Sequence, residues 1–283
     1  MVESGIKTKA YAALKAHGPM VPHEITRRPV GDDDVHVKIH YASICHSDIH
    51  EVRVEWAAYQ APSTFPMVPG HEITGEVFAV GKNVTHLKVG DPVAVGCLVD
   101  CCRECENCKK GEENYCATGF VGTYNHREKY PHFPGWDPVT KLGPITHGGY
   151  SQDIVVHKMF AYTLPKNAPL EQIAPLLCAG ITVYSPLKYF GIKAGQKLAV
   201  AGLGGLGYMA VKFGLAMGCH VTVISRGTGK KDEALKRLGA HDFLDSTNKE
   251  EWDAAKERFD QIMDTISADH DIPAYLSLLN VNG

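Results

Sequence analysis

Four regularly spaced cysteines are the residues of this 283-residue sequence whose types and spacing best suit metal chemistry. They form Cys-x2-Cys-x2-Cys-x7-Cys, at Cys102, Cys105, Cys108 and Cys116. Such thiolates can converge on one tetrahedral zinc ion, and four of them leave no coordination position open. We therefore predict a structural zinc that stabilises a loop and does no catalysis. Unpaired cysteines are the alternative. Cys101 could compete as a ligand, but the spacing to Cys105 favours Cys102.

Charge and composition argue against several other classes of protein. Acidic residues outnumber basic ones between positions 97 and 116, so this loop repels phosphate and does not suit nucleic-acid recognition. The formal net charge of −3 gives no attraction to an anionic membrane. No apolar run is long enough for a bilayer, and the first residues lack the apolar core of a signal peptide. Nine cysteines without an export signal favour reduced thiols, hence a cytoplasmic protein.

A glycine motif, Gly-x-Gly-x-x-Gly, is the second chemical signal. It consists of Gly202, Leu203, Gly204, Gly205, Leu206 and Gly207. Glycine-rich turns are common, so the pattern alone is weak. Here it follows an apolar strand expected at 197–201 and opens a helix expected at 206–217, which is the context that the motif requires. The glycines permit a tight turn and let a pyrophosphate approach the helix N-terminus. We therefore predict a dinucleotide-binding loop.

The end of the next strand, expected at 220–224, indicates which dinucleotide binds. NAD enzymes place a carboxylate there for the ribose hydroxyls, and this chain has Ser225 and Arg226, with Lys230 close behind. A basic pair suits a 2′-phosphate, and a neutral serine does not repel it. A solvated basic loop without a ligand is the alternative. The sequence therefore favours NADP(H) over NAD(H).

The elements that must position these motifs differ between two parts of the chain. Residues 1–170 contain short alternating runs such as 35–40 and 74–80, which predict a mainly β domain. Residues 171–283 alternate strands with helices, including a helix at 230–238, strands at 243–244 and 261–264, and a helix near 272–279. Such alternation indicates a parallel sheet with crossover helices. The fold class is therefore α/β, in two domains.

With these motifs in place, the sequence resembles the zinc-dependent medium-chain alcohol dehydrogenases. Gly70-His71-Glu72-x2-Gly75-x5-Gly81-x2-Val84 matches the zinc signature of that family. The stretches 45–50 and 177–185 resemble its cinnamyl alcohol dehydrogenase branch. The resemblance covers essentially the whole chain. It implies a GroES-like catalytic domain at 1–170, with the structural zinc loop, and a Rossmann NADP-binding domain at 171–283.

The resemblance also implies a second, catalytic zinc whose ligands are scattered along the sequence. Its ligands would be Cys45, His71 and Cys178, which leave one position open for the substrate oxygen. Bound zinc would act there as a Lewis acid. Glu72 corresponds to the family's carboxylate behind the zinc, and Asp48 would fix the tautomer of His71.

The same resemblance assigns roles around the substrate and the cofactor. Ser47 would hydrogen-bond the substrate oxygen and pass a proton through the cofactor ribose to His50 near solvent. His46 would contact the pyrophosphate, and Thr182 would lie near the nicotinamide. Trp56 is the candidate for lining a pocket for aromatic or bulky aldehydes, although ordinary packing is an equal alternative. The stretch 60–64 looks longer than in bacterial relatives, which predicts a different pocket rim.

Near its end the chain departs from the family pattern. A dinucleotide-binding sheet usually has about six parallel strands, and the sequence signals four. The family continues beyond this point and pairs subunits into a homodimer through a later strand. We therefore expect a Rossmann domain that is incomplete in its C-terminal half, with dimerisation and turnover in doubt.

Three functions remain open at this point. The leading one is a zinc-dependent oxidoreductase that interconverts alcohols and aldehydes, mainly by NADPH-dependent reduction of aromatic or medium-size aldehydes such as cinnamaldehyde. The second is a zinc-stabilised dinucleotide-binding protein without catalysis. The third is an NAD-dependent polyol or alcohol dehydrogenase of the same superfamily. All three have small molecules as partners and involve neither nucleic acid nor a membrane.

Overall fold

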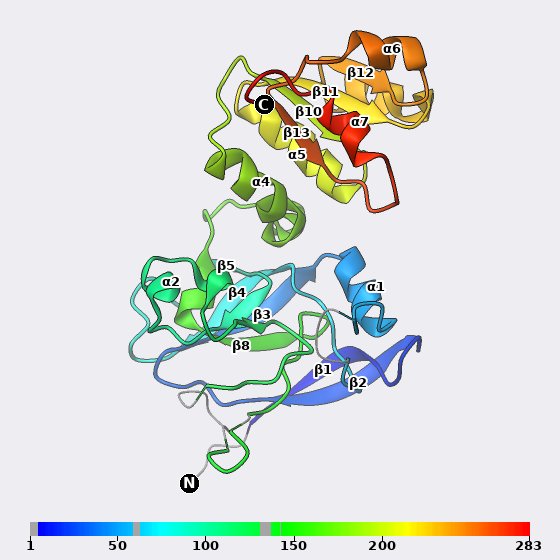
Figure 1. Cartoon of the computed structure of the whole chain (residues 1–283). Helices are drawn as coiled ribbons and strands as arrows, with labels where there is room; N and C mark the ends of the chain where they lie inside the picture. Colours follow the sequence, from blue (N-terminus) through cyan, green and yellow to red (C-terminus); the bar gives the residue numbers. More distant parts are fainter. Residues whose placement is uncertain (1–4, 59–62, 131–136, 142) are drawn as a thin grey trace. The chain divides into compact units, whose positions relative to one another are not determined.

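The chain divides into two compact units, Met1–Cys178 and Ala179–Gly283. The computed structural model describes residues 5–58, 63–130, 137–141 and 143–283 (Figure 1). Residues 170–177 belong to the first unit, where Thr74 Oγ1 donates to the carbonyl of Leu170 at 2.9 Å and Cys97 Sγ contacts the carbonyl of Leu177 at 3.5 Å. The division therefore falls after position 170, and Cys178 lies in the first unit.

The first unit is mainly β, because its alternating apolar residues each bury one face of a strand. A five-stranded antiparallel sheet has the order β8-β3-β4-β5-β9, and β1-β2 and β6-β7 form separate pairs. The strands are β1 (Ile6–Ala13), β2 (Met20–Arg27), β3 (Asp34–Ala42), β4 (Ile73–Val80), β5 (Pro92–Val95), β6 (Leu98–Asp100), β7 (Val121–Gly122), β8 (Asp153–His157) and β9 (Tyr162–Thr163). The helices are α1 (His46–Val52), α2 (Glu106–Lys109) and α3 (Leu170–Ile173).

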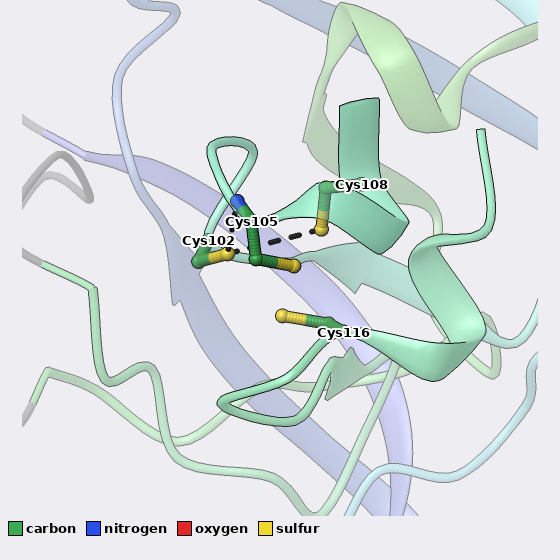
Figure 2. Close-up of side chains that lie close together, drawn as sticks. All are labelled: Cys102, Cys105, Cys108 and Cys116. Atoms are coloured by element: carbon green, nitrogen blue, oxygen red, sulfur yellow. Dashed lines mark hydrogen bonds between the residues drawn. The ribbon is translucent and has the colours of Figure 1, made fainter. Parts of the chain in front are cut away.

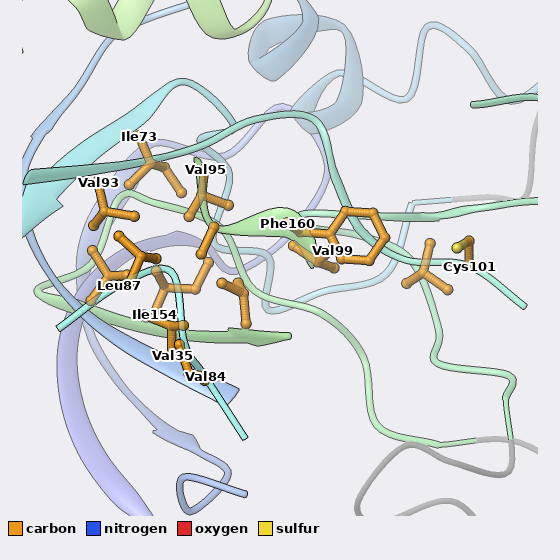
Figure 3. Close-up of a cluster of buried hydrophobic side chains, with 14 of the residues drawn as sticks. Val35, Ile73, Val84, Leu87, Val93, Val95, Val99, Cys101, Ile154 and Phe160 are labelled. Atoms are coloured by element: carbon orange, nitrogen blue, oxygen red, sulfur yellow. The ribbon is translucent and has the colours of Figure 1, made fainter. Parts of the chain in front are cut away.

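The core of this unit lies between the sheet and the cysteine loop. Val35, Ile73 and Val93 are fully buried, and each such side chain contributes about 1.5–3 kcal/mol by leaving water. Figure 3 shows the cluster extending from Ile73 and Val93 to Cys101. Cys108 and Cys116 belong to the same cluster, so the sheet core anchors the loop that carries the four regularly spaced cysteines.

The second unit is a doubly wound parallel sheet. Its strands are β10 (Lys197–Ala201), β11 (His220–Ser225), β12 (Asp242–Asp245) and β13 (Gln261–Asp264), in the order β12-β11-β10-β13. Its helices are α4 (Ala179–Tyr189), α5 (Gly205–Ala216), α6 (Lys249–Ala254) and α7 (Ile272–Leu276). Leu198 and Val200 pack on one face with residues of α4 and α5, and Ala199 and Ala201 pack on the other with Leu278. Burial on both faces explains the continuous apolar strands.

The expected helices and strands of this unit are present, with one difference. The helix expected at 230–238 is a short turn at Thr228–Lys230 followed by a wide helical turn at Glu233–Arg237, where the N–H of Leu238 bonds the carbonyl of Glu233. Gly239 ends it with a φ of +81°, the left-handed conformation that favours glycine. Within the described residues, no helix combines the length and apolar character needed to cross a bilayer.

Candidate functional site

Three segments of the first unit bring together the residues expected to hold a catalytic metal. Cys45 precedes α1, His71 and Glu72 precede β4, and Cys178 follows the short turn at Ala174–Leu177. One ligand atom from each of these four residues lies within 4.8 Å of all the others. The sulfur atoms of Cys45 and Cys178 are 3.8 Å apart. With Zn–S bonds of about 2.3 Å, two tetrahedral ligands stand about 3.8 Å apart, so this spacing fits zinc.

Asp48 orients the imidazole of His71. The Nδ1 of His71 lies 3.1 Å from Asp48 Oδ1, which leaves Nε2 as the nitrogen for a metal. Gly70 N–H also donates to Oδ1, at 3.0 Å, and Cys45 N–H and Tyr150 Oη–H donate to Oδ2 at 3.1 and 2.7 Å. Burial opposes ionisation of Asp48, but the bonds from His71, Tyr150 and Cys45 lower its pKa overall. The carboxylate therefore stays charged beside the imidazole.

The ligand cluster favours a cation. The pKa of Cys45 is raised to about 11, first by hydrogen bonding to Cys178 and then by burial. Burial lowers the pKa of His71, but Asp48 and the two thiols outweigh this effect and raise it to about 12. Two thiols, an imidazole and the Glu72 carboxyl thus form a half-buried site that gains from a positive charge. Ser43 Oγ donates to Glu72 and holds its carboxylate in place.

The residues expected to relay a proton lie on α1, which begins directly after Cys45. Ser47 Oγ is 3.5 Å from Cys45 Sγ, at the edge of the cluster. His50 lies one turn further along and pairs with Glu55 through Nδ1. The rings of His46 and His50 have their centroids 4.5 Å apart. Ser47 thus lies beside the cluster and His50 one turn further along α1, and their part in a proton relay stays a prediction.

Trp56 stacks on His50. Its indole lies 4.9 Å from the His50 ring at an interplanar angle of 29°. The expectation that Trp56 lines a substrate pocket stays a proposal. Of the pocket rim expected at 60–64, positions 60–62 lie outside the described residues.

The four regularly spaced cysteines form a second cluster. Their sulfur atoms all lie within 4.8 Å of one another, and the Cys102–Cys108 separation is 3.8 Å. Figure 2 shows the four side chains pointing toward one centre. Cys105 is the N-cap residue of α2. This helix is a single turn, so it brings Cys108 close to Cys105. Backbone N–H groups of Cys105 and Ala117 approach the sulfurs of Cys102 and Cys105, both at 3.4 Å, as thiolate acceptors require.

The pKa values of Cys108 and Cys116 shift in opposite directions. Burial, followed by the neighbouring Cys105 thiol, raises the pKa of Cys108. Burial also opposes ionisation of Cys116, but hydrogen bonds from Thr118, the Cys102 backbone and Tyr130 lower its pKa to about 5. Close thiolates repel one another, and a divalent cation relieves that repulsion. The cluster contains Cys102, and the buried Cys101 is not among its four members.

The glycine loop lies between β10 and α5, at the position where the strand order reverses between β10 and β13. Gly202 has a φ of +85°, and a Cβ at Gly207 would stand 2.1 Å from the carbonyl oxygen of Gly202. A Cβ added at Gly204 or Gly205 would meet no atom of the described residues within 4 Å. The first and last glycines therefore close the turn, and the two between them leave room for a pyrophosphate. Leu203 is buried beside them, whereas Leu206 is 37% exposed.

The other expected cofactor residues lie around this loop or on α4, except His46, which is the first residue of α1 in the first unit. Ser225 ends β11, and Arg226 is exposed and has no hydrogen bond or ion pair among the described residues. Lys230 Nζ donates to the carbonyl of Leu203 at 2.6 Å, which links the turn after β11 to the glycine loop. Thr182 is exposed on the first turns of α4. An unpaired guanidinium at the end of β11 is available to a 2′-phosphate.

Sequence reasoning missed three residues that hydrogen-bond Asp48, Glu72 or His50. Tyr150 donates to Asp48 from a position 102 residues away, so neither motif nor spacing could reveal it. Ser43 and Glu55 are closer in sequence to their partners Glu72 and His50. A carboxylate five residues after a relay histidine was a visible signal for Glu55. For Tyr150 the sequence offers no comparable signal.

Comparison with known families agrees with this arrangement. The family model "Alcohol dehydrogenase GroES-like domain" matches residues 31–166, and the model "Zinc-binding dehydrogenase" matches residues 205–283. The class that fold and site define is therefore a dinucleotide-dependent, zinc-binding dehydrogenase.

Similar curated proteins come from plants and bacteria. A probable cinnamyl alcohol dehydrogenase of Oryza sativa is 50% identical over 96% of this chain and 70% of its own length. An NADP-dependent alcohol dehydrogenase C of Mycolicibacterium smegmatis is 49% identical over 97% of this chain and 74% of its own length. The chain belongs to the zinc-dependent alcohol dehydrogenase family and is an alcohol dehydrogenase.

Solved structures give the same fold. A cinnamyl alcohol dehydrogenase of Sorghum bicolor has a TM-score of 0.86 and 44% identity, and the match covers 97% of this chain and 74% of that one. A Helicobacter pylori relative solved with NADP(H) has a TM-score of 0.86 and 42% identity over 99% of this chain and 74% of its own. The expected GroES-like and Rossmann-type fold is therefore confirmed.

Proposed function

We propose that this alcohol dehydrogenase binds two zinc ions and uses NADP(H), and that it acts mainly in the reduction of aromatic or medium-size aldehydes. The convergence of Cys45, His71 and Cys178 within one cluster carries the catalytic part of this proposal. Zinc held there would supply a Lewis acid for the carbonyl oxygen. The second zinc would be structural and held by Cys102, Cys105, Cys108 and Cys116.

The residues of α1 manage the proton of the reaction. Aldehyde reduction consumes a proton as well as a hydride, and Ser47 Oγ, 3.5 Å from Cys45 Sγ, stands where it can donate that proton to the substrate oxygen. His50, one turn later, exchanges the proton with solvent. Asp48 holds the His71 imidazole in the tautomer that leaves Nε2 free. Each role comes from a side chain fixed by a helix or by a buried hydrogen bond.

The choice of NADP(H) rests on the turn after β11. Arg226 is exposed and unpaired within the described residues, and Ser225 adds no charge beside it. The solved relative from H. pylori was crystallised with NADP(H), and the M. smegmatis relative is named NADP-dependent, which supports the same choice here. The thiol clusters suit a reducing compartment, so we place the protein in the cytoplasm.

The substrate class rests on relatives named as cinnamyl alcohol dehydrogenases. A second candidate, polyol oxidation, has support from a probable mannitol dehydrogenase of Medicago sativa that is 47% identical over 99% of this chain. Trp56 favours the first, because an indole near the relay suits a planar substrate.

The decisive experiment is NADPH oxidation by the zinc-loaded chain with cinnamaldehyde, followed by absorbance, beside mannitol with NAD⁺. We expect turnover with cinnamaldehyde that disappears on chelation. Activity only with mannitol and NAD⁺ would favour the polyol assignment. NADPH binding without turnover on any aldehyde would support a non-catalytic dinucleotide-binding protein.

A further inference from the structure

Asp245 lies beside the turn that carries Arg226, at the end of the neighbouring strand. The parallel register of β11 and β12 pairs Ser225 with Asp245. Asp245 Oδ1 accepts a hydrogen bond from Gly227 N–H at 2.8 Å, and Ser246 N–H donates to the carbonyl of Ser225 at 3.0 Å. Gly227 has a φ of +68°. The carboxylate therefore holds a glycine turn in the left-handed conformation directly after Arg226.

The Asp245 carboxylate is a fixed negative charge. Besides Gly227 N–H, its Oδ1 accepts bonds from the Thr247 N–H at 2.9 Å and the Thr247 hydroxyl at 2.8 Å. These donors lower the pKa of Asp245, with the Thr247 backbone as the largest cause. Glu251 adds a second carboxylate, which accepts from Asp245 N–H at 3.3 Å. The turn is thus held by one carboxylate and flanked by another.

The nearby cations do not neutralise this charge. Arg226 has no ion pair within the part of the chain that the structure describes, and Lys230 Nζ donates to the Leu203 carbonyl instead. A 2′-phosphate brought to Arg226 therefore meets both an attractive guanidinium and a repulsive carboxylate at the end of the neighbouring strand. The repulsion is moderate, because Asp245 is only half-buried and solvent screens it.

We propose that Asp245 is a specificity-determining residue for the cofactor: it anchors the turn that presents Arg226, and its charge lowers the affinity for the 2′-phosphate. The proposal rests on the proposed NADP(H) site at 225–230. Asp245 thereby narrows the difference in affinity between NADP(H) and NAD(H). With Arg226 and no carboxylate beside it, that difference in affinity would be larger. Asp245→Asn separates the two effects, since the amide keeps an acceptor oxygen and loses the charge.

The test uses 2′,5′-ADP and 5′-AMP as probes, which differ only in the 2′-phosphate. Their affinities for the zinc-loaded full chain are measured by titration calorimetry at about 10 mM and about 0.5 M salt. We expect Asp245→Asn to bind 2′,5′-ADP at least about threefold more tightly at low salt, with the gain shrinking at high salt and 5′-AMP unchanged. Asp245→Ala also loses the anchor, so both probes should bind more weakly than to Asp245→Asn.

Asp253→Asn is the matched control. Asp253 is a carboxylate on the exposed side of α6 and pairs with Lys249 and Lys256. We expect this variant to leave the affinity for both probes unchanged. An equal gain in Asp253→Asn, or an unchanged or weaker affinity of Asp245→Asn for 2′,5′-ADP, overturns the role of Asp245.

The wild-type chain tests the NADP(H) assignment separately. Equal affinity for 2′,5′-ADP and 5′-AMP would overturn that assignment. The change that Asp245→Asn makes to 2′,5′-ADP binding still decides whether the Asp245 charge acts on the 2′-phosphate.

Discussion

The carboxylate of Asp48 links three separate segments of the chain, at 45–48, 70–71 and 150, beside the candidate metal cluster. It takes hydrogen bonds from His71, Tyr150 and the backbone N–H groups of Cys45 and Gly70. The Cys45 bond joins it to the start of α1, and the Tyr150 bond joins it to the segment before β8. One buried charge therefore fixes both the imidazole of His71 and the loop that carries the thiol of Cys45, which makes Asp48 sensitive to substitution.

We expect Asp48→Asn to lower zinc affinity or turnover by about 10- to 100-fold, because the amide is a weaker acceptor for the His71 Nδ1–H. Zinc retention is measured by competition with a chelator, and turnover by NADPH oxidation. Asp32→Asn, on an exposed carboxylate paired with Lys82, is the control and should behave as the wild type. Unchanged zinc retention and turnover in Asp48→Asn would show that the bond to His71 is dispensable.

At the scale of elements, two glycines of the loop between β10 and α5 have different roles: Gly207 matters for packing, and Gly205 matters for cofactor binding. Gly207→Ala places a Cβ 2.1 Å from a backbone oxygen, so the strand–helix turn must open, at a cost of about 1–3 kcal/mol. In Gly205→Ala the new Cβ has no neighbour within 4 Å in the described part of the chain, and alanine is a good helix former at the start of α5. The unfolding temperature should therefore fall in Gly207→Ala and stay unchanged in Gly205→Ala. Both variants should bind NADPH more weakly than the wild type, as measured by calorimetry. Normal NADPH binding in Gly205→Ala would show that the loop is not part of the cofactor site.

The cysteine loop offers a second test at this scale. Cys108 belongs to the four-sulfur cluster, whereas Cys101 is buried in the same core outside it. Cys108→Ser should lose about one zinc per chain and lower the unfolding temperature, because the loop depends on its metal. Cys101→Ser should keep its zinc. Elemental analysis of the two variants checks this, and metal loss in Cys101→Ser alone would exchange the roles of the two cysteines.

At the scale of the whole molecule, local patterns predicted more of the fold than of the site. Strand alternation and the glycine motif were enough to predict the mainly β unit and the parallel sheet. The spacing of apolar residues and the residues that form turns are local properties of a sequence. Cys45 and Cys178 are 133 residues apart, and only the family resemblance could pair them. The resemblance also implied Asp48 as the partner of His71, but the bond from Tyr150 to Asp48 had no signal in the sequence, because that contact depends on tertiary packing. The widened turn at Glu233–Arg237 likewise departs from the regular helix that its residues favoured.

Glu128 connects stability of the first unit to pH. It is 1% exposed, and neither carboxyl oxygen has a hydrogen-bond partner within the described residues. Burial, and then the charge of nearby Asp100, raises its pKa from 4.5 to about 8, although Arg28 and Arg103 oppose this. The folded chain therefore holds a proton on Glu128 that the unfolded chain releases above pH 4.5. Its stabilising effect is complete below pH 4.5 and is lost as pH rises through 8.

Glu128→Gln should remove this dependence, because the amide resembles the protonated carboxyl and cannot ionise. We expect the unfolding temperature of the wild type to fall further between pH 6 and pH 9 than that of Glu128→Gln, measured by circular dichroism. Glu76→Gln, at an exposed position on β4, is the control and should follow the wild type. Parallel curves for the wild type and Glu128→Gln would mean that Glu128 titrates at its ordinary pKa. A steeper fall in the wild type alone would make the core beside the cysteine loop the alkali-sensitive part of the molecule.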